Sequence, residues 1–456
     1  MSSPSYVLSS EAQHQIFSEW NLPSSCSVNV IKQSENHTYL IQVLPCVTQE
    51  NNNTINSEST SLQKIYILRL TPKHHRSMQA IQAELDFIQR IHDASQVLWE
   101  TSLDHHSLPS LHVCPPIQRC KQALSSDKND DMYSSPLIAT LHSPYQNNTT
   151  DHGDNKEQAN ENSSSKSDDS SIYYAVLFEY ARGSSVLEKW IGLTNESFID
   201  ALGRAIGEMH RIVASYDQQS SKEWKLMAEN IPLWYDTHNG ACKIERIRER
   251  ANQYGHEPSR ILLNLWENLK DFLAQLKPSH DTFGVIHGDI NVSNYFAEKT
   301  SEQEHAQVWI FDFDQVQRNY FGCDLAVVLQ MVRFFEDDGL GIGKIEGFDA
   351  DRFRGVFLQA YKETCPRGMI EEGHLDPNHL KYFEMFREFY HTSVAVDILF
   401  RHEHPQDDHT TSGQPLVHFE ESIISFCFVM SIHKTTTPRA DNLSYTLKSL
   451  LFHFAS

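Results

Sequence analysis

The stretch VIHGDINVSN, residues 285–294, is followed by WIFDFDQV, residues 309–316, and in both an apolar run gives way to carboxylate and amide side chains. The first run ends as a short buried strand would, after which Asp289 is expected to project from a loop with Asn294 five residues further on. A carboxylate on such a loop can accept a proton from a hydroxyl group, and an amide oxygen nearby can bind a hard cation. We therefore expect the two side chains to face one site.

The segment that joins the two stretches has the pattern of a β-hairpin. In YFAEKTSEQEHAQVWIFDFD, residues 295–314, an apolar run is followed by a polar turn near 301–306 and by a returning strand over 308–311. Such a hairpin would carry Asp312 back beside Asn294. The pair would offer Mg²⁺ a carboxylate and an amide oxygen, which are ligands suited to a cation bound to phosphates.

Together these residues resemble the signature of the aminoglycoside phosphotransferase and choline kinase group, which are small-molecule kinases with a protein-kinase-like fold. The signature is H-x-D-x-x-x-x-N followed by a hydrophobic strand and an Asp, and this chain matches it with His287, Asp289, Asn294 and Asp312. The resemblance implies that Asp289 is the catalytic base or the group that orients the acceptor hydroxyl. It also implies that Asn294 and Asp312 hold Mg²⁺ on the phosphates of ATP. His287 is expected to brace the loop by hydrogen bonding rather than to act as a base.

The resemblance covers most of the chain between about residues 27 and 335 and implies nucleotide-binding roles in its N-terminal part. The candidates are Ser34 and Asn36 in SENHTY, Arg69 in KIYILRL, Glu84 in the following helix, and Glu179 and Ala181 in LFEYARG, whose backbone would receive adenine. Arg69 stands where many kinases carry a lysine, and two interpretations stay open, namely contact with phosphate oxygens or an ion pair with Glu84. A plain hairpin turn explains Ser34 and Asn36 nearly as well as a phosphate contact does.

Two further positions bear on control and on loop structure. Gly288 stands where protein kinases usually carry an arginine that reads a phosphorylated activation loop, so control of that kind is not expected. Asp324, in GCDLAVVL, is expected to anchor the catalytic loop through hydrogen bonds rather than to bind substrate.

The order of predicted elements indicates an α+β protein. By the resemblance this is a bilobal protein-kinase-like fold, with a small antiparallel-sheet N-lobe over residues 1–182 and a larger, mostly helical C-lobe over 183–456. Polar insertions are expected at about 47–62 and at 121–170, and the second is nearly free of apolar residues over much of its length, which predicts disorder. Helices are expected from residue 79 and over 198–213, 261–276, 324–335, 377–400 and 420–430.

Composition narrows the function classes. The chain has 456 residues, 39% of them hydrophobic, and a formal net charge of -22, which argues against a nucleic-acid-binding protein. Its eight cysteines contain no C-x-x-C pair and predict reduced thiols rather than a zinc site or a disulfide framework. The start, MSSPSYVLSS, lacks a basic region followed by an apolar run, so a cytoplasmic location without membrane attachment is expected.

The function expected from these observations is an ATP- and Mg²⁺-dependent transfer of the γ-phosphoryl group to a hydroxyl of a small molecule. Amino alcohols, hydroxy amino acids and aminosugars are the acceptor types that the resemblance implies. The alternative is a catalytically weak, pseudokinase-like protein that binds nucleotide or serves as a scaffold. Arg69 and the insertions favour this alternative, and the intact signature set disfavours it.

Overall fold

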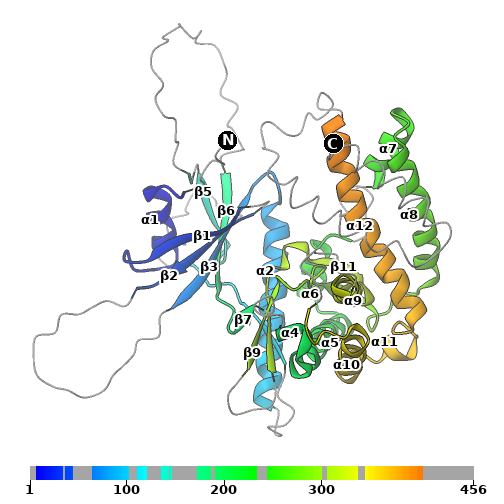
Figure 1. Ribbon diagram of the computed structural model, residues 1–456. Coiled ribbons are helices and arrows are strands. Elements are labelled where there is room, and N and C mark those ends of the chain that lie inside the picture. The colour runs from blue at the N-terminus through cyan, green and yellow to red at the C-terminus, as the bar shows by residue number, and fades with distance from the viewer. Residues whose placement is uncertain are drawn as a thin grey trace, which may run out of the picture. The chain divides into compact units, whose positions relative to one another are not determined.

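The computed structural model describes residues 7–33, 36–44, 64–101, 110–120, 135–142, 144–145, 172–185, 191–233, 244–299, 306–336 and 345–403 (Figure 1). The chain divides into two compact units. The N-terminal unit comprises Met1–Gln89 and Cys114–Tyr180, and the C-terminal unit comprises Arg90–Val113 and Ala181–Ser456. Helix α2 (Met78–Thr101) contributes residues to both.

The N-terminal unit is built on a five-stranded antiparallel sheet in the order β1-β2-β3-β6-β5. The alternation of apolar and polar residues that predicts strands near SENHTY appears as alternating burial along β2, with Tyr39 and Ile41 turned inward. The strands are β1 (Ser27–Gln33), β2 (His37–Gln42), β3 (Ile65–Pro72), β5 (Ala139–His142) and β6 (Ile172–Glu179).

Helix α1 (Ser10–Glu19) covers one face of this sheet. The Ser9 hydroxyl caps the helix by accepting a hydrogen bond from the Ala12 backbone N–H. Ile16 and Trp20 are buried in a core shared with sheet residues such as Leu68. The helix therefore closes the hydrophobic face that the sheet alone would leave exposed.

The prediction of one disordered insertion over 121–170 is wrong for part of that range. Residues 139–142 form β5, which pairs with β6, and Leu137, Ile138 and Leu141 are buried. The apolar run LIATL is short, so the segment around it still has a strongly polar composition. The end of this run nevertheless lies in the edge strand of the sheet. The predicted insertion at 47–62 and the predicted helix at 420–430 lie outside the described residues.

Two small sheets carry the loops of the C-terminal unit. One has the order β4-β10-β9-β7, in which β10 runs antiparallel to β9 and parallel to β4. The other pairs β8 with β11 in antiparallel fashion. The strands are β4 (Leu111–Val113), β7 (Ser184–Ser185), β8 (Phe283–Ile286), β9 (Tyr295–Lys299), β10 (Ala306–Ile310) and β11 (Gln317–Tyr320), with a 3-10 turn η3 (Phe313–Gln315).

Helices surround these sheets and make up most of the unit. Helix α5 packs along α10, and α12 packs against α8 and α9. The helices are α4 (Ile191–Thr194), α5 (Glu196–Gln219), α6 (Lys222–Glu229), α7 (Ile244–Gln253), α8 (Glu257–Gln275), α9 (Gly322–Glu336), α10 (Ala350–Thr364), α11 (Gly368–Glu371) and α12 (Pro377–Glu403). The predicted α+β composition, with an antiparallel N-terminal sheet and a mostly helical C-terminal part, is confirmed.

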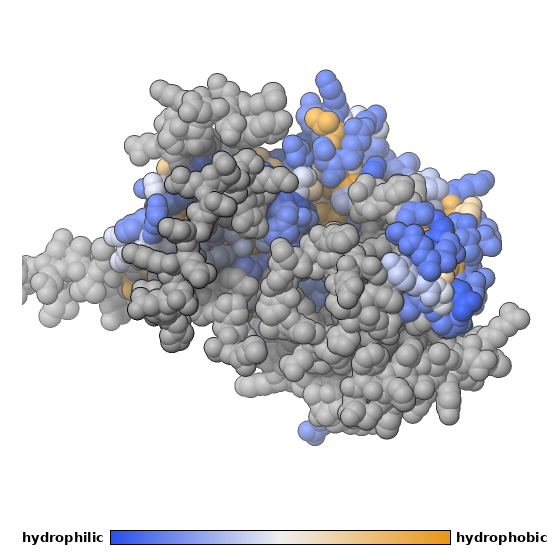
Figure 2. All heavy atoms as spheres, turned by 90° about the horizontal axis from the view of Figure 1, so that it is seen from above, coloured by the Kyte–Doolittle hydropathy of each residue, from blue (hydrophilic) through white to orange (hydrophobic). Residues whose placement is uncertain are grey.

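One face of the molecule is largely polar where its residues are described. On the face shown in Figure 2, hydrophilic residues predominate among the described atoms and hydrophobic ones occupy smaller separate areas. No helix in the described ranges combines the length and the apolar character needed to cross a membrane.

Candidate active site

The catalytic loop of the resemblance, residues 287–294, runs from the end of β8 to the start of β9. Its N-terminal end is fixed because β8 pairs with β11, with Ile286 opposite Gln317. Its C-terminal end is fixed because β9 pairs with β10, with Tyr295 opposite Ile310. The predicted hairpin is thus confirmed, and the loop is held between two strand pairs.

Gly288 allows this loop to turn sharply. Its φ of 84° lies in the left-handed region, and a Cβ atom there would lie 2.3 Å from the backbone oxygen of Gln315. Any residue with a side chain would therefore be strained and would collide with backbone. The close approach explains why a glycine occupies the position, independently of any role in phosphorylation control.

His287 uses both ring nitrogens inside the protein. Nδ1 accepts a hydrogen bond from the backbone N–H of Asp289 at 3.2 Å, so the proton lies on Nε2, which donates to the carbonyl of Phe311 at 3.0 Å. The side chain is fully buried. His287 therefore braces the loop against the end of β10, as predicted, and has no ring nitrogen left to act as a base.

Asp324 anchors the same loop from the first turn of α9. Its carboxylate is fully buried and accepts backbone hydrogen bonds from His287 at 3.1 Å and from Gly288 at 2.8 Å. His210 Nε2 lies 3.1 Å from Asp324 Oδ2, and His210 Nδ1 lies 2.9 Å from the Tyr361 hydroxyl. Burial, with smaller contributions from Cys365 and Asp324, raises the pKa of Tyr361, so the phenol stays protonated beside His210. The predicted structural role of Asp324 is confirmed.

The Asp289 carboxylate is held at both oxygens. Oδ2 accepts hydrogen bonds from Nδ2 of Asn291 at 2.9 Å and from Nδ2 of Asn294 at 3.1 Å. Oδ1 forms an ion pair with the guanidinium of Arg387. The side chain is still 22% exposed, so it remains open to a molecule that binds beside the loop.

Asn294 and Asp312 lie at the same end of the β9–β10 hairpin, as predicted. The Asn294 carbonyl accepts a hydrogen bond from the Phe311 N–H at 3.0 Å. The Asn294 amide nitrogen is committed to the backbone and side chain of Asp289, which orients its Oδ1 as the acceptor atom. That oxygen accepts a hydrogen bond from the Ser293 hydroxyl at 3.2 Å. Asp312 has a φ of 65°, a conformation that a non-glycine residue rarely adopts and that is found preferentially at functional sites.

The donor set at this end of the hairpin suits a magnesium ion. An amide oxygen and a carboxylate are hard oxygen ligands, and Mg²⁺ usually takes only one or two protein ligands and completes its shell with water and phosphate oxygens. No cluster of three or more His, Cys, Asp or Glu side chains occurs in the described ranges. The residues present therefore fit a cation shared with a phosphate better than an all-protein metal cage.

The N-terminal unit contains a buried ion-pair cluster. Glu84 is fully buried and pairs with Arg69 at 2.7 Å and with Arg76 at 2.5 Å. Burial raises the pKa of Glu84, but the two guanidinium groups outweigh it and hold the pKa below its usual value. The Arg69 guanidinium also lies 5.2 Å from the centre of the Phe178 ring. The ion-pair interpretation of Arg69 is thus realised, and Arg76 is a partner that the sequence analysis missed.

The other predicted nucleotide contacts are placed as follows. Asn36 is buried, and its side-chain oxygen accepts a hydrogen bond from the Thr71 hydroxyl at 2.8 Å. The backbone N–H of Glu179 donates to the carbonyl of Pro115 at 3.1 Å, and Ala181 is buried. Ser34 lies outside the described residues.

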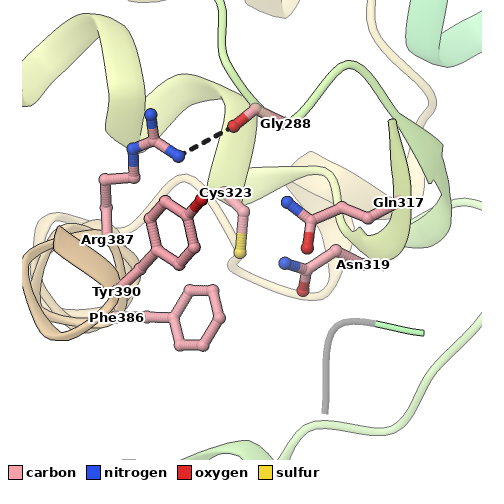
Figure 3. Close-up of a pocket in the computed structure, with 7 residues that line it drawn as sticks. All are labelled: Gly288, Gln317, Asn319, Cys323, Phe386, Arg387 and Tyr390. Atoms are coloured by element: carbon pink, nitrogen blue, oxygen red, sulfur yellow. Dashed lines mark hydrogen bonds between the residues drawn. The ribbon is translucent and has the colours of Figure 1, made fainter. Parts of the chain in front are cut away.

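Arg387, on α12, is the site residue that the sequence analysis missed. Its guanidinium donates to the Gly288 carbonyl at 2.9 Å and pairs with Asp289 (Figure 3). The available signal was its spacing, because Arg387 follows the buried Phe383 by four residues and therefore lies on the buried face of α12. An arginine on a buried helix face needs a charged partner.

A small hollow lies beside this contact. Gln317, Asn319 and Cys323 line one side, and Phe386, Arg387 and Tyr390 from α12 line the other, with Gly288 between them (Figure 3). The hollow encloses about 10 Å³, roughly the space for one water molecule. The back of the catalytic loop is thus closely packed against α12.

Comparison with known proteins places the signature in a family. Residues 162–369 match the model described as the phosphotransferase enzyme family. These residues therefore resemble the phosphotransferase enzyme family. The matched segment of this family contains His287, Asp289, Asn294 and Asp312, and the resemblance predicted from them is confirmed. Arg69, Glu84 and Arg387 lie outside it.

The relatives of this chain are distant. An amicoumacin kinase from Bacillus subtilis (strain 168) is 23% identical over 223 residues, which is 48% of this chain and 54% of that protein. The alignment therefore spans about half the length of this curated relative. A solved structure of an amicoumacin kinase in complex with AMP-PNP, Ca²⁺ and Ami has a TM-score of 0.57 at 16% identity and covers 94% of both chains. A microcompartment-associated aminopropanol kinase has a TM-score of 0.50 at 14% identity, over 92% of this chain and 96% of that one. These structures share the fold of this chain.

Proposed function

We propose that this protein is an ATP-dependent phosphotransferase that moves the γ-phosphoryl group of ATP to a hydroxyl of a small molecule. The observation that carries the proposal is the joint placement of three side chains at one end of the β9–β10 hairpin. Asp289 and Asn294 are hydrogen-bonded to each other there, and Asp312 follows the strand that returns beside them.

Asp289 is the proposed base. Its carboxylate is fixed by Asn291, Asn294 and Arg387, and it retains exposed surface through which an acceptor hydroxyl can approach. A base held in one orientation before the acceptor binds does not have to be ordered during the reaction. Because both ring nitrogens of His287 are engaged, Asp289 is the better candidate of the two for this role.

Asn294 and Asp312 would hold Mg²⁺ through the amide Oδ1 and the carboxylate. When bound, the cation supplies positive charge that offsets the negative charge of the ATP phosphates. The hydrogen bonds from the Asn294 amide nitrogen to Asp289 give a physical reason for the orientation of Oδ1. The same bonds link the metal-binding residue to the base.

The proposed transfer balances as follows. The acceptor hydroxyl loses its proton to the Asp289 carboxylate as its oxygen forms a bond to the γ-phosphorus. The bond between that phosphorus and the bridging oxygen of ADP breaks, and ADP leaves with the electron pair. Catalysis rests on positioning and charge stabilisation, because no covalent intermediate with the protein is needed.

The acceptor classes to test come from the sequence resemblance and from the names of the relatives. One relative is a kinase of amicoumacin and one structural neighbour is a kinase of aminopropanol. We propose an acceptor of the amino alcohol, hydroxy amino acid or aminosugar type.

The test is ADP release by the purified protein with Mg²⁺ and ATP against a panel of these three acceptor classes. We expect at least one acceptor to stimulate ADP release, and Asp289→Asn to reduce its turnover by about 100-fold or more. Asp351→Asn is the matched control, because it alters an exposed carboxylate of the same unit and should leave turnover unchanged.

Two outcomes would contradict the proposal. If Asp289→Asn turns over the responsive acceptor as fast as the parent, Asp289 is not the base. If the protein binds Mg²⁺ and ATP but no acceptor raises ADP release, the nucleotide-binding scaffold is the better account.

A further inference from the structure

Arg387 is a charged residue in a buried position. It is only 8% exposed, and its charge is balanced by Asp289 on the catalytic loop. Burying a guanidinium is unfavourable unless its charge and its N–H groups are partnered. Nε of Arg387 is buried and makes no hydrogen bond to any described residue. Burial of Arg387 thus leaves one N–H group without a hydrogen bond among the described residues. The hydrogen bonds that the guanidinium does make go to the catalytic loop.

The two loop contacts of Arg387 act on one short stretch of chain. One nitrogen donates to the Gly288 carbonyl at 2.9 Å, and another pairs with Oδ1 of Asp289. A planar guanidinium that contacts a backbone carbonyl and the next residue's carboxylate fixes the side-chain direction relative to the backbone. Oδ2 is held separately by Asn291 and Asn294, so Arg387 supplies the only described side-chain contact to Oδ1.

The helix that carries Arg387 is itself firmly packed. Phe383 and Phe389, on either side of it in sequence, are fully buried. Phe389 lies 5.5 Å from Trp266 of α8, ring centre to ring centre, and the Arg387 guanidinium lies 5.2 Å from the centre of the Tyr390 ring. A contact made from such a support can orient the loop, because packing fixes the rotamer of the supporting side chain.

We propose that Arg387 is a positioning residue for phosphoryl transfer, which holds the Asp289 carboxylate in the orientation that receives the acceptor's proton. The proposal rests on the proposed function. It predicts that Arg387 acts on turnover through Asp289 and has little effect on the affinity for ATP.

The experiment is a double-mutant cycle on kcat, with Arg387→Gln, Asp289→Asn and the double variant. We expect Arg387→Gln to lower kcat by about 100-fold, the size of loss that follows a small misplacement of a catalytic group, with the KM for ATP changed less than about threefold. In the Asp289→Asn background the same substitution should cost little more, because the group it positions is already disabled.

Arg333→Gln is the matched control. Arg333 also reaches α12 from a neighbouring element and forms an ion pair there, with Glu384, and its described hydrogen bond and ion pair go to that residue and not to the catalytic loop. We expect its kcat to equal that of the parent. Equal thermal unfolding midpoints for the Arg387→Gln and Arg333→Gln proteins would exclude general unfolding as the cause of the loss.

Chemical rescue provides a second readout that a purely structural role would not move. Arg387→Ala leaves a space of guanidinium shape beside Asp289, so millimolar guanidinium should restore part of its kcat, whereas urea at the same concentration should not. Arg333→Ala should respond to neither.

The outcomes separate the two proposals. A parent protein without acceptor-dependent turnover overturns both. A parent with turnover overturns the role of Arg387 alone if Arg387→Gln keeps its kcat, or if the losses from Arg387→Gln and Asp289→Asn multiply in the double variant.

Discussion

The backbone N–H of Gly288 donates a 2.8 Å hydrogen bond to Oδ1 of Asp324, a residue 36 positions later in the chain. Because Oδ2 of the same carboxylate accepts from the His287 N–H, a single buried side chain satisfies two successive amides of the catalytic loop. Such a carboxylate cannot be replaced by an apolar group without leaving both donors buried and unpaired.

We therefore expect Asp324→Ala to lower the free energy of unfolding by about 3 kcal/mol or more and to abolish turnover. Urea titration followed by circular dichroism measures the first effect, and ADP release measures the second. Asp351→Ala removes a carboxylate that is 94% exposed and should change neither. Equal stability of the two variants would show that the Asp324 network does not hold the loop.

Gly288→Ala should disable the loop by steric conflict. The added Cβ would meet backbone at 2.3 Å, in addition to the strain of a positive φ. Gly255→Ala isolates the second effect, because Gly255 also has a positive φ, of 62°, but nothing lies within 4 Å of its Cβ position. We expect Gly255→Ala to cost about 1 kcal/mol with normal kcat, and Gly288→Ala to cost more and to lose activity. Normal kcat in Gly288→Ala would contradict the assignment.

Glu84→Gln should be strongly destabilising, because it leaves Arg69 and Arg76 without their buried counter-charge. Removing one partner of a buried ion pair typically costs about 3 to 5 kcal/mol. Since the pKa of Glu84 is lowered in the folded state, its contribution is present above its usual value of 4.5 and is lost as the pH falls below it. The acid limb of the stability profile should therefore flatten in Glu84→Gln, as measured by urea unfolding across the pH range.

The other interpretation of Arg69, a contact with the phosphate oxygens of ATP, can be tested through the KM for ATP of a variant at this position. If Arg69 contacts phosphate, Arg69→Lys should raise the KM for ATP even where the unfolding midpoint of the protein stays close to that of the parent. An unchanged KM would leave the ion pair as its whole role.

His112 gives the C-terminal unit a separate pH dependence. Its ring stacks on Trp309 with centroids 4.7 Å apart, and burial, with help from Arg182 and His92, lowers the pKa of His112 to about 4. The unfolded chain takes up a proton near pH 6.5 and the folded one near pH 4, so stability falls as the pH drops through this window.

The loss is up to about 3 kcal/mol at 1.36 kcal/mol per pKa unit. His112→Phe should remove most of it while keeping a stacked ring, and His280→Gln, which alters a half-exposed histidine, should not. An unchanged pH profile in His112→Phe would contradict the assignment.

The parts of the site that could be predicted from the sequence are those joined by short stretches of chain. His287, Asp289 and Asn294 lie on one loop, and Asp312 follows a hairpin whose alternation and polar turn are visible locally. A strand pattern and a fixed spacing are enough to bring such residues together.

The parts that could not be predicted depend on pairing across long distances in the chain. β4 and β5 are three and four residues long and acquire strand geometry only by pairing with β10 and β6. Arg387 reaches Asp289 across 98 residues, and its spacing from Phe383 indicates a buried position but does not identify the partner. Arg76 follows the strand that carries Arg69, and only the folded chain shows that both meet Glu84.

The path of the chain has a consequence for how the protein can be made. Residues 90–113 belong to the C-terminal unit although they precede the second half of the N-terminal one, and β4 within them pairs with β10 about two hundred residues later. During synthesis β4 leaves the ribosome long before β10 does, so the C-terminal unit cannot be completed until most of the chain has emerged. For the same reason, a fragment cut between Tyr180 and Ala181 would deprive β10 of its parallel partner, and the two halves should regain full structure only when mixed.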